Sequence, residues 1–216
     1  MSDPAPVEGW VEEALRAELP GLGVVSLEVP APRLGRSPKG VREHLDALAS
    51  RFRGADALVL RQRPVPHAYR VCYRHVGLDP DATRVPAEAA AIDRLVQGGL
   101  RSRGLLEDAL TIALVETGVP LWALDAGLLD GPLGLRLSRE GEPLGRGEGA
   151  LALPAGRIVV ADADAALGPL FGEPAPELAV TRDTSTVLLF AVRVAGVSAM
   201  EVHEALWACA EALDAR

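Results

Sequence analysis

The chain has 216 residues and a formal net charge of −8, and 49% of its residues are hydrophobic and 24% charged. This is a globular composition, and the length lets one large domain bury a core without disulfides or a structural metal. The acidic balance excludes strong nonspecific binding to nucleic acid, because affinity for a phosphate backbone comes mainly from Lys and Arg that displace counterions. We therefore expect any RNA contact to be local, and no contact with DNA.

The N-terminal segment 1–9 is acidic and contains proline, so it lacks the basic and then apolar order of a secretory signal. Apolar runs such as 187–192 are far shorter than the ~20 residues that cross a bilayer. Cys72 and Cys209 each lie in a helical pattern of apolar residues and are interpreted as small buried side chains. These features predict a cytoplasmic protein with no membrane contact.

Apolar residues recur at helical spacing in five segments. The first begins at Ser37 and Pro38, interpreted as an N-cap followed by proline at the first helical position, and should end near Gly54. Three more helices, each followed by a glycine, are expected over 68–76, 86–96 and 105–117. A last helix is expected after Ser198, which forms a plausible capping box with Glu201.

Short β-like runs lie mostly in the second half of the chain, at 133–137, 150–153, 158–161 and 187–194, and one precedes the helices at 24–29. The run 24–29 alternates as a half-buried strand does. Helices cluster in the first half and strands in the second, so strict βαβ alternation is absent. This order favours an α+β fold over a doubly wound parallel sheet. Without a repeat or a linker, one domain over 1–216 is the simpler interpretation.

The chain contains none of the common catalytic signatures: it has no P-loop, no GxSxG, no HExxH and no His/Cys cluster at metal-binding spacing. We therefore expect no metal and no cofactor. The histidines are scattered and are interpreted as surface or capping residues. Asp162 and Asp164 follow a strand, where such a pair could bind a cation, but alternating carboxylates in this position usually solvate a turn.

A series of short motifs runs in order through the second half of the chain. A helix containing Asp108 leads to Gly118-Val119-Pro120-Leu121-Trp122-Ala123-Leu124-Asp125. A strand and a loop then carry Gly131, Arg136 and Glu140-Gly141-Glu142. The last three motifs are Val159-Val160-Ala161-Asp162, Leu170-Phe171-Gly172-Glu173 and Thr184-Ser185-Thr186-Val187-Leu188-Leu189.

In order and spacing these motifs resemble the tRNA-editing domain formed by the third and fourth modules of the bacterial phenylalanyl-tRNA synthetase beta chain, here standing alone. The resemblance is strongest over 86–192. It implies a three-layer α+β arrangement containing a β-sandwich of unusual topology flanked by helices. It also implies an activity, the hydrolysis of the ester that joins a wrong amino acid to the 3′ end of a tRNA.

Such a site needs a side-chain pocket, an anchor for the α-amino group and a held water, because an aminoacyl ester is already activated. The resemblance implies Glu173 and Thr184 as the catalytic residues. It implies substrate contacts at Trp122, Asp125, Gly168, Gly172 and Thr186, where the glycines leave the backbone uncovered. Trp122 stands where the family has a histidine, and an indole donates only one hydrogen bond. We therefore expect a pocket that is more apolar, or smaller, than that of the synthetase.

The expected RNA contacts are four arginines that lie close in sequence, Arg61, Arg63, Arg70 and Arg74. A solvated helix face explains them about as well. Two functions are open at this point. One is a trans-acting deacylase for mischarged aminoacyl-tRNA, and the other is a non-catalytic binding module for an amino acid, an aminoacyl ester or RNA. In both, the expected partner is the 3′ end of a tRNA or an aminoacyl ester, and the oligomeric state is left open.

Overall fold

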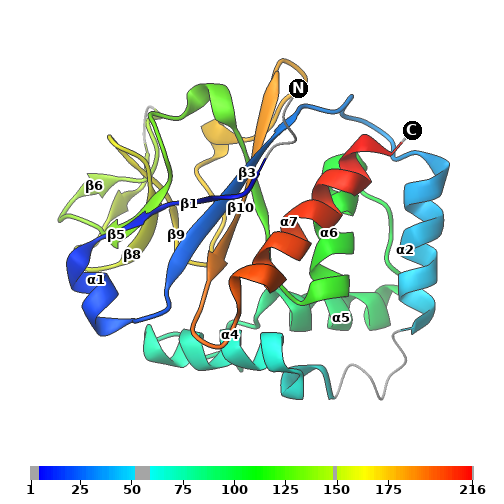
Figure 1. Cartoon of the computed structure of the whole chain (residues 1–216), viewed down its shortest axis with the longest axis horizontal. Coiled ribbons are helices and arrows are strands. Elements are labelled where there is room, and N and C mark those ends of the chain that lie inside the picture. The colour runs from blue at the N-terminus through cyan, green and yellow to red at the C-terminus, as the bar shows by residue number, and fades with distance from the viewer. Residues whose placement is uncertain (1–4, 52–58, 148–149, 216) are drawn as a thin grey trace. The chain divides into compact units, whose positions relative to one another are not determined.

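The structure, a computed structural model of the chain, describes residues 5–51, 59–147 and 150–215 (Figure 1). Contacts between Cα atoms divide the chain into two compact units. Unit 1 comprises residues 1–31 and 122–193, and unit 2 comprises residues 32–121 and 194–216. The strands of the described residues lie in unit 1, and the helices from α2 (Lys39–Arg51) to α7 (Ala199–Asp214) lie in unit 2. The fold is α+β, as predicted. The division into two units does not test whether the chain is one domain, so the single domain stays a prediction.

The first sheet of unit 1 has four antiparallel strands in the order β1 (Val7–Glu8), β3 (Gly23–Pro30), β10 (Thr186–Arg193) and β4 (Trp122–Asp125). The two long central strands confirm the predictions for 24–29 and 187–194. An uninterrupted apolar run is typical of a strand buried on both faces. Accordingly, every residue from Val187 to Val192 is buried.

The second sheet has the order β2 (Trp10–Val11), β5 (Gly134–Leu137), β8 (Ile158–Ala161) and β9 (Ala166–Pro169). Strands β2 and β5 are parallel and the other pairs antiparallel. Of the strand expected at 150–153, only β7 (Ala152–Leu153) forms. It pairs in a hairpin with β6 (Glu142–Pro143). Strand β9 was not predicted, because its glycine and proline are poor strand formers and its order comes from pairing with β8.

Gly9 lies where the N-terminal segment passes from one sheet to the other, since β1 pairs in the first sheet and β2 in the second. Its N–H donates to the carbonyl of Val24 at 2.8 Å, and the next N–H, of Trp10, donates to Leu133 at 3.1 Å. A Cβ at Gly9 would lie 2.2 Å from the Leu133 carbonyl oxygen and 2.6 Å from Val24 Cγ1. Only glycine fits this close crossing. The short helix α1 (Glu13–Glu18) follows β2.

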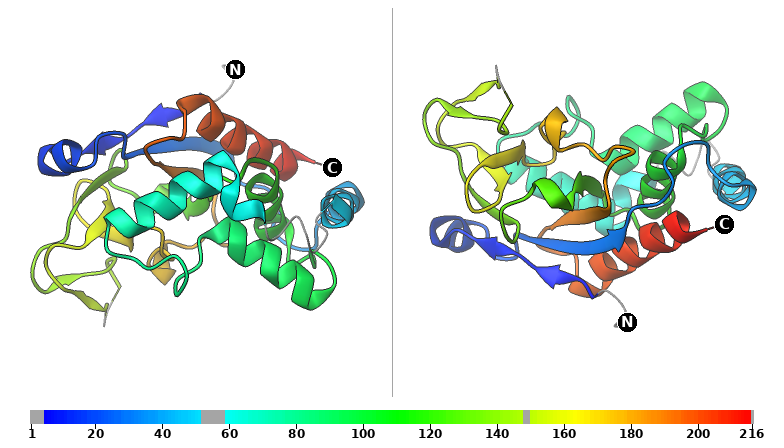
Figure 2. Two further views of the ribbon diagram at one scale, coloured as in Figure 1. Left: turned by 90° about the horizontal axis from the view of Figure 1, so that it is seen from below. Right: turned by 90° about the horizontal axis from the view of Figure 1, so that it is seen from above.

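Unit 2 is built from α2 (Lys39–Arg51), the 3₁₀ turn η1 (Leu60–Gln62), α4 (Pro64–His75), α5 (Pro86–Gln97), α6 (Leu105–Thr117) and α7 (Ala199–Asp214). Helices α6 and α7 lie side by side in Figures 1 and 2. Their facing residues, among them Ala109, Ala113, Val202 and Leu206, are fully buried. The predicted capping box is confirmed: Glu201 N–H donates to Ser198 Oγ at 3.2 Å, and Ser198 N–H donates to Glu201 Oε2 at 2.7 Å.

The prediction for the start of the first helix was wrong in one detail. Helix α2 begins at Lys39, one residue later than predicted, so Pro38 and not Ser37 directly precedes it. Proline has no side-chain oxygen that could cap the helix, and the hydroxyl of Ser37 donates a hydrogen bond to Asp108. The predicted end of this helix, near Gly54, lies outside the described residues. Helix α4 begins at Pro64, four residues earlier than the pattern indicated, with proline in its first turn.

Both cysteines are buried and unbridged, as interpreted from the sequence. Burial raises the pKa of the Cys72 thiol to about 11 and that of Cys209 to about 12. A thiol with so high a pKa is protonated and unreactive at neutral pH. The two residues therefore act as small core side chains.

Asp162 is not the solvated turn residue that the sequence indicated. Its side chain is fully buried and accepts from Arg146 Nη2 at 2.5 Å and from the N–H groups of Asp130, Asp164 and Ala165 at 2.9, 3.1 and 3.0 Å. Burial by itself raises the pKa of Asp162, but these hydrogen bonds together hold it below its ordinary value. The carboxylate ties the 130 and 146 loops to the end of β8.

We expect Gly9→Ala to lower the free energy of unfolding by about 1–3 kcal/mol, because a forced shift in a packed region costs that much. The measurement is urea unfolding followed by circular dichroism. Gly40→Ala is the matched control: its Cβ would meet nothing within 4 Å and it lies in the first turn of α2. The control should leave stability unchanged or raise it slightly. Equal stability of the two variants would contradict the tight crossing at Gly9.

We expect Asp162→Asn to destabilise the protein by about 3 kcal/mol at pH 7, because it leaves Arg146 without its buried partner. A carboxyl whose folded pKa is depressed contributes stability above its unfolded pKa, about 3.9, and loses it as the pH falls through the folded pKa. The variant should therefore lose less stability than wild type on acidification below about pH 4. Unfolding free energies measured from pH 7 to pH 3 test this, with the exposed Asp164→Asn as the control.

Candidate functional site

Asp125 and Thr184 meet at the end of β4, 59 residues apart in sequence. Thr184 Oγ1 donates to Asp125 Oδ2 at 2.6 Å and accepts from the N–H of Thr181 at 2.9 Å. Asp125 Oδ1 accepts from the N–H of Gly127 at 2.9 Å. The pairing of β10 with β4 sets Val187 opposite Asp125, so the turn that precedes β10 delivers Thr184 to this carboxylate.

The two residues of this pair differ in what they can offer a ligand. Thr184 is 8% exposed, and its hydroxyl is already used once as a donor and once as an acceptor. Asp125 is half-buried, and each carboxylate oxygen can accept a further hydrogen bond. Asp125 is therefore the residue that can bind a cationic group, and Thr184 holds it in place.

Trp122 and Thr186 are not brought together with this pair. Side chains alternate between the two faces of a strand. Trp122 lies three residues before Asp125, and Thr186 precedes Val187, which is the register partner of Asp125, so both project from the opposite face. The indole stacks on Phe190 with ring centroids 5.6 Å apart, and Trp122 is 9% exposed. In this structure Trp122 packs in the core of unit 1.

Glu173 lies on the loop after β9 and is exposed. The loop turns at Phe171, whose φ of 61° is in the left-handed region, and the turn is closed by the N–H of Gly172 donating to Pro169 at 2.9 Å. A non-glycine residue in this region costs about 1–3 kcal/mol and is common at functional sites. Backbone strain therefore marks this loop.

The two predicted site glycines, one in β9 and one in the loop that follows it, allow close packing. A Cβ on Gly168 would lie 3.1 Å from the Cα of Pro174, and one on Gly172 would lie 2.5 Å from Cγ of Pro169. The side that each glycine leaves open is thus occupied by the chain itself. The N–H of Leu170 donates to Ile158 of β8 at 3.0 Å, and the N–H of Ala175 donates to Leu167 of β9 at 2.7 Å.

A cavity of about 570 Å³ lies on the Leu188 face of the first sheet. It is lined by Leu188, by Ser26 and Glu28 of β3, and by the segment from Ala126 to Leu133. Asp125 projects from the other face, and no residue of the loop from Leu170 to Glu173 lines this cavity. The predicted site residues Glu173, Asp125 and Thr184 therefore do not line this cavity, and the site that they would form together stays a prediction.

The Arg136 and Glu142 motif positions form an ion pair with two hydrogen bonds. Arg136 Nη1 donates to Glu142 Oε2 at 2.8 Å, and Nη2 donates to Oε1. The pair is largely buried, with side-chain exposures of 12% and 10%. The hydrogen bond from Arg136 lowers the pKa of Glu142, which also accepts from the N–H of Arg139 at 2.9 Å. This part of the motif stabilises the β5–β6 region.

The four predicted RNA-contact arginines all lie in unit 2, in different settings. Arg70 is 5% exposed and donates to both oxygens of Glu88, at 3.0 and 2.9 Å, and to Asp81 at 2.6 Å. A phosphate could reach it only after these ion pairs break. The hydrogen bond from Arg70 lowers the pKa of Asp81, and the charges of Arg74 and Arg61 add to this effect. Arg61 and Arg74 are exposed.

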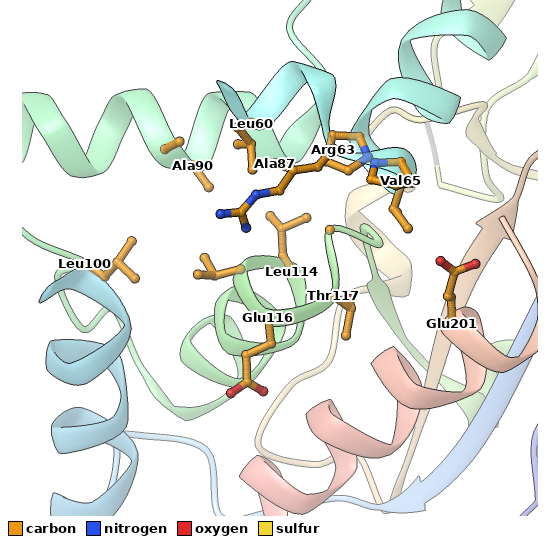
Figure 3. Close-up of a pocket in the computed structure, with 15 residues that line it drawn as sticks. Leu60, Arg63, Val65, Ala87, Ala90, Leu100, Leu114, Glu116, Thr117 and Glu201 are labelled. Atoms are coloured by element: carbon orange, nitrogen blue, oxygen red, sulfur yellow. The ribbon is translucent and has the colours of Figure 1, made fainter. Parts of the chain in front are cut away.

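Arg63 lines a separate cavity of about 210 Å³ in unit 2 (Figure 3). Its apolar lining comes from a cluster of Leu60, Ala87, Ala91, Leu114 and Val115. Figure 3 shows the Arg63 guanidinium extending among these side chains, whereas Glu116 points away from it. Glu116 Oε1 lies 2.9 Å from His44 Nε2.

Within residues 5–51, 59–147 and 150–215, no group of three His, Cys, Asp or Glu side chains is arranged to hold a metal ion. Over the same ranges, no helix is long and apolar enough to cross a membrane.

Comparisons with known proteins match this chain to one family. The model of the B3/4 domain matches residues 68–206. The phenylalanine–tRNA ligase beta subunit of Xylella fastidiosa strain 9a5c is 37% identical over 127 residues, or 57% of this chain. That of Xanthomonas campestris pv. campestris strain 8004 is 37% identical over 126 residues, or 56% of this chain. The chain spans 15% of the length of these two relatives. Because the family model covers more than half of the chain, the chain belongs to the B3/4 domain family.

Proposed function

We propose that this protein binds the aminoacyl 3′ end of a tRNA and hydrolyses the ester of a mismatched amino acid. The observation that carries the proposal is the 2.6 Å hydrogen bond from Thr184 to Asp125, which holds a half-buried carboxylate with free acceptor sites. Membership of the B3/4 family, with phenylalanine–tRNA ligase beta subunits as relatives, supplies the substrate class.

Asp125 is assigned to the α-ammonium group of the aminoacyl ester, because a carboxylate is the natural acceptor for a cationic amine. Thr184 is a positioning residue that keeps Asp125 in one orientation. Glu173, exposed on the strained loop, is assigned to the attacking water or to the amine. Water adds to the ester carbonyl, the bond to the ribose 3′ oxygen breaks, and the amino acid and the tRNA 3′ hydroxyl are released. Little acid–base chemistry is needed, because the ester is already activated.

The charge of unit 1 supports placing the aminoacyl group there. Unit 1 contains 7 arginines and 16 Asp or Glu residues, which is a net charge of −9. Such a field attracts a cationic ammonium group and repels a phosphate backbone. The amino acid end of the substrate therefore fits unit 1 better than the polynucleotide does.

The test is a deacylation assay of the purified protein on a panel of tRNAs that each carry a mismatched amino acid. We expect Asp125→Asn and Glu173→Gln to lower kcat/KM at least tenfold for the substrate that is hydrolysed, a loss of about 1.4 kcal/mol of transition-state stabilisation. Glu18→Gln, an exposed carboxylate on α1, is the control and should leave the rate unchanged.

Full activity in both site variants would refute the residue assignment. If wild type hydrolyses no member of the panel, the hydrolytic function fails and the binding module takes its place. A thermal-shift screen against amino acids and tRNA then tests binding, because a ligand of the native state raises its stability.

Strain at Phe171 can be measured with two variants. Phe171→Ala and Phe171→Gly both remove the ring, but only glycine relieves the cost of the positive φ. We expect the glycine variant to be more stable than the alanine variant by about 1 kcal/mol in urea unfolding. We also expect the glycine variant to be the less active, because its loop is less ordered. Equal stabilities would show that residue 171 carries no backbone strain.

A further inference from the structure

Two loops of unit 2 are joined where α2 and α6 begin. One precedes α2 and spans residues 32–38, and the other precedes α6 and spans residues 98–104. The N–H of Leu105 donates to the carbonyl of Gly35 at 3.0 Å. A Cβ on Gly104 would lie 3.3 Å from that same oxygen, so the two backbones are in contact. In Figure 1 both helices start at the upper end of unit 2.

A single buried carboxylate fastens both loops. Asp108 is 2% exposed and accepts from Ser37 Oγ of the first loop at 2.5 Å. It also accepts from Ser102 Oγ of the second loop at 2.5 Å and from the N–H of Arg103 at 2.8 Å. The carboxylate is thus satisfied by hydroxyl and backbone donors. The loops are ordered before any ligand arrives, which lowers the entropic cost of binding.

The exposed side chains of these arginine loops, residues 32–38 and 98–104, include four arginines: Arg33, Arg36, Arg101 and Arg103. Neither loop contains Asp or Glu. Among the residues that the structure describes, none of the four forms an ion pair, in contrast to Arg70 and Arg146. Four guanidinium groups therefore stand on two touching loops without a carboxylate partner.

Charge elsewhere in the molecule favours this position for a polyanion. Unit 1 has a net charge of −9, whereas unit 2, residues 32–121 and 194–216, contains 15 Lys or Arg and 14 Asp or Glu, which is +1. Arg61 of η1 and Arg74 of α4 are exposed as well, but the carboxylate of Asp81 interacts electrostatically with both of them. A phosphate backbone is repelled by unit 1, whereas the arginine loops, which contain no carboxylate, attract it.

We propose that the arginine loops bind the sugar–phosphate backbone of RNA. Guanidinium groups suit phosphate because they are planar, permanently charged and able to donate two parallel hydrogen bonds. Backbone contacts position a nucleic acid without reading its sequence. That the polyanion is a tRNA rests on the proposed function, whereas the location of the site rests on the loops alone.

The test measures the binding of uncharged tRNA by fluorescence anisotropy between 50 and 200 mM salt. The variant carries Arg33→Gln, Arg36→Gln, Arg101→Gln and Arg103→Gln. We expect at least a tenfold loss of affinity at the lower salt concentration. The slope of log K against log salt should fall by about 0.7–0.9 for each phosphate contact removed.

A matched control changes the net charge by the same amount elsewhere. It carries Arg16→Gln, Arg139→Gln, Arg157→Gln and Arg182→Gln, all exposed residues of unit 1. The control should keep the wild-type affinity and slope. Equal losses in the two variants would overturn the proposal, because the effect would then be one of overall charge. If the quadruple variant does not fold, Arg33→Gln/Arg36→Gln and Arg101→Gln/Arg103→Gln are tested separately, each expected to lose part of the slope.

Two further measurements separate this inference from the proposed function. Hydrolysis of a short aminoacylated 3′-end oligonucleotide does not need the arginine loops, so the loop variant should keep that activity. Binding of tRNA without hydrolysis would support RNA binding by the arginine loops and refute the deacylase function. Hydrolysis without measurable affinity for tRNA would refute RNA binding by the loops and support the deacylase function. Vesicles containing phosphatidylserine are the competing ligand, and tighter binding to them than to tRNA would overturn the assignment to RNA.

Discussion

The antiparallel pairing of β3 with β10 holds unit 1 together, and the candidate site depends on it. Eight residue pairs run from Thr186 opposite Pro30 to Arg193 opposite Gly23, joining segments from the two ends of the chain. Because β10 also pairs with β4, its register determines that the turn before it reaches Asp125. A slip of one residue would move every side chain of β10 to the other face. The hydrogen bond between Thr184 and Asp125 would then be lost.

Buried carboxylates act as fasteners in both units. Asp162 ties three segments of unit 1 through Arg146 and backbone N–H groups, and Asp108 ties two loops of unit 2 through two serines and a backbone N–H. A charge that is buried without such partners is strongly destabilising, so each carboxylate requires the loops around it to be in place. This requirement orders loops that carry little apolar surface of their own. The arginine loops and the Asp130 loop are ordered by the same means.

The residues singled out by the resemblance to phenylalanyl-tRNA synthetase beta chains, including Trp122 where the family has a histidine, have four different roles. Arg136 and Glu142 stabilise the β5–β6 region, and Gly168 and Gly172 let a loop pack closely on β9. Trp122 fills the core against Phe190. Asp125 and Thr184 form a polar pair with binding capacity left over. A motif match therefore identifies the family, whereas the role of each residue depends on what surrounds it.

The amino-acid sequence was sufficient to predict the α+β class, the central strands and most of the helices, because these depend on periodicity and local end signals. The run from Val187 to Val192, the capping box at Ser198 and the stop at Gly118 are such local features. The sequence also indicated the family, and it predicted Asp125 and Thr184 as site residues. The tertiary structure, in contrast, brings Thr184 to Asp125, places Trp122 on the opposite face of the sheet and buries Arg70. It also ordered β9 and brought Gly35 to Gly104. Each of these outcomes depends on pairing between segments that are distant in sequence. Such partners cannot be predicted from the local spacing of residues.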